Sequence, residues 1–237
     1  GIYSWGEISP CTPFQFKLCK HFIKTIGTYP DREVLEEKIK ENNGAIGFGI
    51  GSALAEIDEL SFSGNEKWKL TAPKSSILLP NGNAFLYKLD LLIDESKLNN
   101  EQLTLKWKVA IKPENVERKL MTQVLERLPA NSRLRLDANN GWDRNQAMQW
   151  ANYFSNEPRL EWLEQPLPID DLQGLFALSE KIPIALDESL VKYPFLKQKW
   201  KCWQIRRPAL EGDPRIVLKE ITEGTNYLCI STAFETG

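Results

Sequence analysis

The stretch LRLDANNGW, Leu134–Trp142, decides the fold: a short apolar strand ends in an acid, Asp137, and a turn follows. Two later stretches repeat this order, EWLEQPL with Glu164 and IALDESL with Asp187. The three acids are separated by 27 and 23 residues, about the length of one strand–helix unit. The spacing therefore predicts one acid at the carboxyl end of each of three successive parallel strands.

The same rhythm extends on both sides of these stretches. We predict strands at 76–79, 103–109, 133–137, 160–164, 182–187, 202–205 and 227–231, with helices at 114–128, 143–155, 170–180 and 213–222. Such alternation indicates an α/β fold with parallel strands and crossover helices. Seven strands of this spacing suit an eight-fold barrel better than an open sheet, although the periodicity alone does not separate the two.

The first 70 or so residues follow a different pattern. Trp5–Ser9 alternates like an edge strand, helices are predicted at 15–26 and 43–58, and 61–73 reads as a polar loop. A complete barrel needs an eighth strand, and the sequence stops soon after the seventh. We therefore expect segments of the native protein to be missing at both ends of the chain.

The composition indicates an ordinary globular chain of 237 residues, 42% of them hydrophobic. The 30 basic and 32 acidic residues nearly balance, which argues against nucleic acid or an anionic membrane as a partner. The longest apolar-leaning run, Ala45–Ile57, is too short to span a bilayer. The single histidine, His21, excludes multi-histidine metal sites, and the four cysteines form no C-x-x-C pair. We expect a cytoplasmic protein.

The three acids together predict a metal site. On a barrel, the carboxyl ends of the strands meet on the face where active sites lie, so Asp137, Glu164 and Asp187 would converge there. One acid at a strand end is usually a helix cap, but three converging carboxylates repel one another unless a cation compensates them. Mg²⁺ prefers oxygen ligands and keeps waters that a substrate oxygen can replace.

Two lysines precede the acids in LKWKVAIKP. Lys106 and Lys108 are two residues apart on a strand, so their side chains point to the same face. On an edge strand this pattern would only keep lysines in water. Inside a barrel, burial and neighbouring positive charge would lower the pKa of a lysine until it acts as a base near neutral pH.

The order K-x-K followed by D, E and D on the next three strands resembles the enolase superfamily, where such lysines perform acid–base chemistry and such acids hold Mg²⁺. Within it, the chain resembles the o-succinylbenzoate synthase family of the muconate-lactonizing-like branch. The resemblance runs from about residue 4 to the end. Its motifs are WGEISP at 5–10, FGIGSALAE at 48–56, LPNG at 79–82, KWK at 106–108, LRLDAN at 134–139, the LEQP and LDES turns, and STAFET at 231–236.

This resemblance implies a modified (β/α)8 TIM-type barrel with an α+β capping domain. Residues 1–72 would form part of the capping domain and 73–237 the barrel, both incomplete at the chain ends. The implied enzyme is a carbon–oxygen lyase (hydro-lyase). It dehydrates a small molecule, 2-succinyl-6-hydroxy-2,4-cyclohexadiene-1-carboxylate, to o-succinylbenzoate for menaquinone or phylloquinone synthesis.

The resemblance also implies a role for each matching residue. Lys108 matches the base that removes the proton alpha to the substrate carboxylate, and Lys106 matches its supporting neighbour. The metal ligands would be Asp137, Glu164 and Asp187, with Mn²⁺ as an alternative to Mg²⁺. The turn Ser231, Thr232 and Ala233 matches the loop whose backbone amides hold the succinyl group. The sequence does not distinguish a monomer from a homo-oligomer.

One position departs from the family pattern. Where the family has a second lysine before a proline on the sixth strand, QIRRPALEG places Arg207. Arginine stays protonated, so it cannot act as a base, but its charge can still stabilise an anionic intermediate. An N-acylamino-acid racemase or dipeptide epimerase needs two bases and is therefore the weaker alternative. A non-catalytic small-molecule binding protein on the same barrel is another, although such a protein has no evident need for all three acids and both lysines.

Overall fold

The computed structural model describes residues 3–58, 75–80 and 84–233 of the chain. The chain divides into two compact units, one formed by residues 1–72 with 205–237 and the other by residues 73–204. In the described part of the chain, no helix combines the length and apolar character needed to cross a membrane. The predicted loop at 61–73 and the second half of the LPNG motif lie outside the described residues.

The unit of residues 73–204 is built on parallel strands that pair in the order of the sequence. The strands are β1 (Ile77–Leu78), β2 (Thr104–Lys108), β3 (Arg133–Asp137), β4 (Leu160–Glu164), β5 (Ile184–Leu186) and the start of β6 (Trp203–Arg206). This order and direction confirm the predicted α/β fold with parallel strands.

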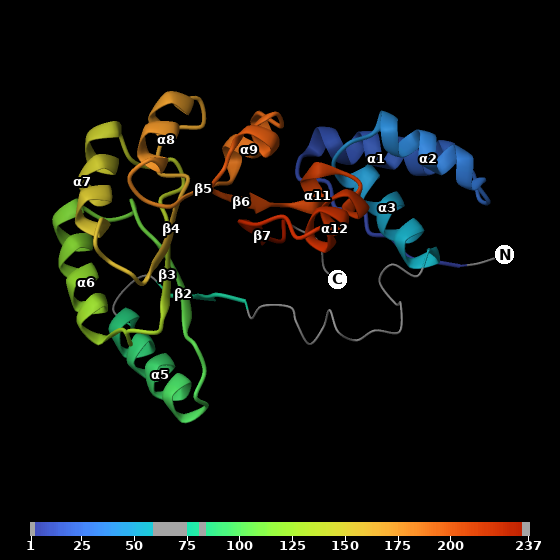
Figure 1. Cartoon of the computed structure of the whole chain (residues 1–237). Helices are drawn as coiled ribbons and strands as arrows, with labels where there is room; N and C mark the ends of the chain where they lie inside the picture. Colours follow the sequence, from blue (N-terminus) through green and yellow to red (C-terminus); the bar gives the residue numbers. More distant parts are fainter. Residues whose placement is uncertain (1–2, 59–74, 81–83, 234–237) are drawn as a thin grey trace. The chain divides into compact units, whose positions relative to one another are not determined.

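Helices connect these strands. They are α5 (Phe85–Leu98), α6 (Glu114–Arg127), α7 (Arg144–Phe154), α8 (Leu172–Ser179), and the short α9 (Glu188–Lys192) and α10 (Leu196–Lys199). Local signals explain their starts: Asp143 and Gln146 form a capping box at α7, and Asp171 accepts a hydrogen bond from the Gly174 amide at α8. Helices α5, α6 and α7 lie on the same side of the sheet (Figure 1).

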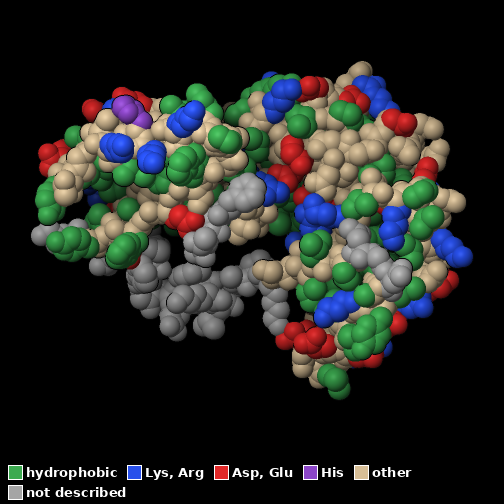
Figure 2. Space-filling view, turned by 180° about the vertical axis from the view of Figure 1, so that it is seen from behind, with side chains coloured by type: hydrophobic (Ala, Val, Ile, Leu, Met, Phe, Trp, Pro, Cys, Tyr) green, Lys and Arg blue, Asp and Glu red, His purple; other side chains and the backbone are tan. Residues whose placement is uncertain are grey.

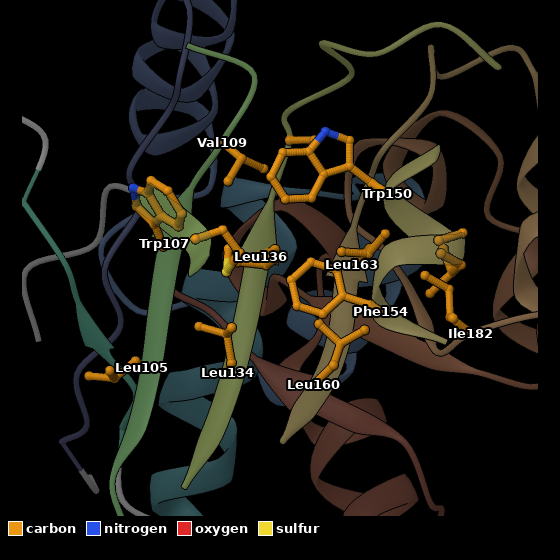
Figure 3. Packing of buried hydrophobic residues seen from close by; sticks show 14 of the residues in the cluster. Leu105, Trp107, Val109, Leu134, Leu136, Trp150, Phe154, Leu160, Leu163 and Ile182 are labelled. Atoms are coloured by element: carbon orange, nitrogen blue, oxygen red, sulfur yellow. The ribbon is translucent and has the colours of Figure 1, made fainter. Parts of the chain in front are cut away.

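Alternation along the strands separates two faces of the sheet. Leu105, Trp107, Leu134 and Leu136 are almost fully buried and pack with residues of the helices, as Figure 3 shows for Trp150 and Phe154 of α7. Because successive side chains on a strand point to opposite faces, the residues between them lie on the other face. That second face carries the polar residues of the candidate site.

The other unit is helical. It contains α1 (Pro13–Thr25), α2 (Arg32–Glu41), α3 (Ala45–Ile57), α11 (Pro208–Glu211), α12 (Pro214–Thr222) and the strand β7 (Leu228–Ile230). Helix α3 approaches the start of α12 closely at Gly51, where an added Cβ would lie 2.7 Å from Cδ of Pro214. Arg215 of α12 then pairs with Glu36 of α2, which ties the three helices together.

Several predicted elements differ from the structure. Strands β3 and β4 have the predicted bounds, whereas β1, β2, β5, β6 and β7 differ from theirs at one or both ends. The predicted strand Trp5–Ser9 is wrong: the segment is not a strand, and the Trp5 amide donates to Oε2 of Glu56 at 2.6 Å. The sequence did not predict helices α2 and α5 or the short helices α9, α10 and α11. The division into a capping domain and a barrel domain stays a prediction.

Candidate active site

The candidate site begins on β2, on the face that turns away from the helices. Lys106 and Lys108 lie on this face together, as the spacing predicted, because Leu105 and Trp107 occupy the helical side. The strand register places Lys108 directly beside Asp137.

The next strand continues the row, because the register places Asp137 of β3 directly beside Glu164 of β4. The strand ends therefore bring one lysine and two acids into a continuous row.

Ion pairs join these side chains. Nζ of Lys106 lies 2.7 Å from Oε1 of Glu164 and 2.9 Å from Oδ2 of Asp137. Nζ of Lys108 lies 3.4 Å from the same Asp137 oxygen. Lys108 is the more exposed lysine, with 40% of its side chain accessible against 22% for Lys106. Lys106 therefore compensates the charge of both acids, and Lys108 is the more accessible of the two lysines.

The charge balance of this cluster alters two pKa values. Burial, reinforced by the negative charge of Asp137, raises the pKa of Glu164 to about 7, although Lys106 opposes the shift. For Lys106, burial acts to lower the pKa, but Glu164 and Asp137 outweigh it and raise the pKa above its ordinary value. The prediction of a lowered lysine pKa is therefore wrong for Lys106, because two carboxylates rather than other cations face it.

Asp187 is the third acid, at the end of β5, where it precedes helix α9. It is 4% exposed, and its negative charge contributes to the raised pKa of Glu164. Its backbone amide donates to Oε1 of Gln165 at 3.2 Å. Asp187 therefore belongs electrostatically to the same cluster as the other two acids.

The donor set fits a hard divalent cation in its chemistry. The three carboxylates are at most 4% exposed and follow three neighbouring strands, and oxygen donors are those that Mg²⁺ prefers. In the described residues, however, no three Asp, Glu, His or Cys side chains are gathered closely enough to hold a metal ion. The Lys106 ammonium lies between Asp137 and Glu164 and supplies the positive charge there.

Sequence reasoning missed two residues of the neighbouring strands, Trp162 and Arg135, that contact Glu164 directly or through each other. Nε1 of Trp162 donates to Oε2 of Glu164 at 3.3 Å. The guanidinium of Arg135 lies 4.1 Å from the centre of the Trp162 ring, and its Nε donates to Glu161 at 2.6 Å. The register of β3 and β4 shifts between Leu134 and Arg135, so alternation along the strands alone does not predict these contacts.

The remaining predicted residues lie in the unit that contains 205–237. Nη1 of Arg207 donates to the backbone oxygen of Thr232 at 2.8 Å, and the Ser231 amide donates to the Arg206 oxygen at 2.9 Å. Arg206 is buried in ion pairs with Glu211 and Glu220. Arg206 thus contacts the predicted substrate-binding turn through its backbone oxygen, and Arg207 contacts it through its side chain.

A small cavity lies elsewhere, at the amino-terminal ends of β1 and β2. Ser96, Gln102 and Thr104 are among its lining residues, and none of the predicted site residues lines it. The candidate site is therefore defined by the charged row at the opposite ends of the strands.

On the face shown in Figure 2, basic, acidic and apolar side chains are interspersed over each unit.

Comparisons with known proteins agree with this arrangement. The family model described as "Enolase C-terminal domain-like" matches residues 99–198. A curated o-succinylbenzoate synthase from Thermosynechococcus vestitus is 30% identical over 224 residues, which are 90% of this chain and 66% of that protein. The enzyme of the same name from Escherichia coli K12 is 27% identical over 222 residues, 92% of this chain and 65% of that protein.

Solved structures show the same relationship. An o-succinylbenzoate synthase from Thermosynechococcus elongatus, complexed with Mg in its active site, superposes with a TM-score of 0.77 and 26% identity, covering 98% of this chain and 73% of that one. A muconate lactonizing enzyme superposes with a TM-score of 0.74 at 19% identity over 98% of this chain and 72% of its own, a likeness of fold.

The chain is similar to members of the enolase superfamily, since the family model matches residues 99–198 and the parallel strands agree with the fold of the solved o-succinylbenzoate synthase. Within that superfamily, its curated relatives are o-succinylbenzoate synthases, so the predicted resemblance is confirmed. The chain spans just under two thirds of the length of these curated relatives.

Proposed function

We propose that the protein is an o-succinylbenzoate synthase. It would dehydrate 2-succinyl-6-hydroxy-2,4-cyclohexadiene-1-carboxylate to o-succinylbenzoate on the route to menaquinone or phylloquinone, in the cytoplasm. The chain would supply most of a (β/α)8 barrel and part of its capping domain. One observation carries the proposal: Lys106 and Lys108 both lie within 3.4 Å of Asp137, at the ends of parallel strands. The names of the curated relatives support it.

Lys108 is the proposed acid–base residue. In its neutral form, its amine takes the proton alpha to the substrate carboxylate, and the electrons of that C–H bond pass into an enediolate. The resulting ammonium then gives a proton to the departing hydroxyl group, which leaves as water while the ring becomes aromatic. One residue on one face is enough for this syn elimination, and Lys108 is the more exposed lysine of the pair.

Lys106 and the three acids prepare the site for that charge. Asp137, Glu164 and Asp187 are the proposed ligands of Mg²⁺ or Mn²⁺. When bound, the ion would stabilise negative charge on the substrate carboxylate where it develops. Lys106 holds Asp137 and Glu164 in place through its two ion pairs and adds one fixed positive charge to the site.

Arg207 and the turn of Ser231, Thr232 and Ala233 are proposed to act on the substrate. The backbone amides of the turn would hold the succinyl group, and the Arg207 guanidinium would stabilise the anionic intermediate. The contact from Arg207 to the Thr232 oxygen keeps this cation beside the turn. Since arginine cannot accept a proton at neutral pH, the two-base racemase and epimerase reactions remain the weaker alternative.

The test is a turnover assay with the cyclohexadiene substrate. The loss of the substrate's ultraviolet absorbance measures the conversion, once with Mg²⁺ and once with EDTA. We expect conversion that requires the metal. Metal binding without conversion would contradict the proposed substrate. Polarimetry with an N-acylamino acid and with a dipeptide would then test the racemase and epimerase. Inactivity on all three, with ligand binding retained, would favour the non-catalytic binding protein.

A further inference from the structure

Gln165 is a fully buried residue between two of the proposed metal ligands in the structure. It directly follows Glu164, is 0% exposed, and has a left-handed backbone with φ of 36°. Residues other than glycine rarely adopt this backbone conformation without compensating contacts, so the contacts around Gln165 must hold its backbone there.

The backbone of Gln165 connects three strand ends. Its amide donates to the Ala185 oxygen of β5 at 2.8 Å, and its oxygen accepts from the Asn140 amide at 2.8 Å, in the loop after Asp137. Gln165 itself follows β4. The three strands tied in this way are the three that carry the acids.

The side-chain amide adds four contacts. Oε1 accepts from the backbone amides of Asp187 and Ser189, both at 3.2 Å, while Nε2 donates to Oγ of Ser189 at 2.8 Å and to the Leu167 oxygen at 3.2 Å. The oxygen and the nitrogen each use their capacity in full. The amide oxygen therefore holds the backbone N–H groups of Asp187 and Ser189, the residues before and after Glu188 at the start of helix α9.

We propose that Gln165 is a positioning residue of the metal site, which sets the Asp187 carboxylate through the backbone amide of Asp187. This inference rests on the proposed function, because it assumes that Asp187 is a ligand. Outer partners that orient metal ligands typically contribute 10- to 100-fold to metal affinity. A residue that only stabilises the fold would leave that affinity unchanged.

Two variants of the full chain separate these roles. Gln165→Met keeps the side-chain length but removes all four contacts. Ser189→Ala removes the Oγ partner of Nε2, and its bond to the Ile169 oxygen, while Oε1 keeps its hold on Asp187. Gln165→Asn, whose amide is one methylene shorter, replaces the methionine variant if that one does not fold. The probe is Mn²⁺ alone, titrated by electron paramagnetic resonance, with amide hydrogen exchange at Asp187 and Ser189 as the second measurement.

We expect Gln165→Met to weaken Mn²⁺ binding at least 10-fold and to increase exchange at Asp187, whereas Ser189→Ala stays within about threefold of the wild type. If the Gln165 variants fold and bind Mn²⁺ as the wild type does, the inference about Gln165 is wrong, while the proposed function is unaffected. Equal loss of affinity in Ser189→Ala would overturn it too, because the whole network rather than the Asp187 contact would then be responsible. A wild-type chain that binds no Mn²⁺ would instead overturn the proposed function on which the inference rests.

Discussion

The ammonium of Lys106 lies 2.7 Å from a carboxylate oxygen of Glu164, a side chain that is 1% exposed. Taking a carboxylate out of water is costly, and a close ammonium repays this cost only with good geometry. Lys106 meets that condition because it also lies 2.9 Å from Asp137. Lys106 therefore supplies positive charge to two buried acids at once.

Replacing Lys106 by methionine should destabilise the chain mainly when no divalent cation is present. Removing one partner of a buried ion pair costs about 3 kcal/mol, because the other charge stays buried without compensation. Added Mg²⁺ should recover part of this loss by supplying positive charge to the same acids. Thermal unfolding of the variant with EDTA and with Mg²⁺ measures both effects.

The control for this comparison is Lys119→Met on the exposed surface of α6, which should change stability little under either condition. A Lys106→Met chain as stable as the wild type in EDTA would show that the ion pairs contribute nothing net. A Mg²⁺ effect of equal size in both variants would show that the cation acts elsewhere.

Replacing Lys108 by alanine should abolish turnover while the chain still binds metal. General acid–base catalysis by one residue contributes roughly 10²- to 10⁴-fold, and Lys108 would act as both base and acid. Lys108 lies 3.4 Å from Asp137, farther than Lys106 at 2.9 Å, so its loss should disturb the acids less than loss of Lys106. Steady-state kinetics and Mn²⁺ titration of Lys108→Ala, beside Lys119→Ala, check this. Undiminished kcat would remove Lys108 from the mechanism.

The sequence could predict the strand-end row because its signals are local. In LRLDA and LEWLE the apolar run, the acid and the turn lie within a few residues, and β3 and β4 have the predicted bounds. Alternation on β2 likewise placed Lys106 and Lys108 on one face. The parallel register of the three strands then places Lys108, Asp137 and Glu164 side by side, so their proximity follows from the predicted strands.

The supporting contacts depend on packing that no short stretch encodes. The hydrogen bonds that Oε1 of Gln165 accepts from the amides of Asp187 and Ser189 cross more than 20 residues and require the loops after β4 and β5 to lie together. The rise of the Lys106 pKa depends likewise on distances to two other strands. The prediction for Trp5–Ser9 failed for the opposite reason: the segment alternates as a strand does, but among the described residues no strand pairs with it.

Arg207 should respond differently to loss of charge and to change of shape. Arg207→Met removes the cation and should lower kcat by roughly 10²- to 10³-fold, as loss of one stabilising donor does at other sites. Arg207→Lys keeps the charge but shortens the reach to the Thr232 oxygen, so it should mainly raise KM. Steady-state kinetics separate the two effects. Equal losses of kcat in both variants would indicate that the geometry of the guanidinium, rather than its charge, is what matters.

The unit of residues 1–72 and 205–237 contains a separate ionic link whose contribution to stability should depend on pH. Arg215 of α12 donates to both carboxylate oxygens of Glu36 of α2, at 2.8 and 2.9 Å, and Arg32 adds a longer contact. The hydrogen bonds from Arg215 hold the pKa of Glu36 below its ordinary value. A carboxyl group whose pKa is lowered by folding stabilises the folded state above its unfolded pKa, about 4.3 for Glu.

The stabilising effect of Glu36 should therefore be complete near pH 7 and should decline as the pH falls below about 4.3 toward the lower folded pKa. Glu36→Gln should be less stable than the wild type at pH 7, and the difference should shrink toward zero as Glu36 becomes protonated. Urea unfolding of both chains from pH 7 to pH 3.5 measures this difference. Glu37→Gln, one residue along the exposed face of α2, is the matched control and should show a small difference at every pH. A Glu36→Gln difference that stays constant across this range would mean that Glu36 stabilises the helices through packing or neutral hydrogen bonds, and that its charge pair with Arg215 contributes nothing net.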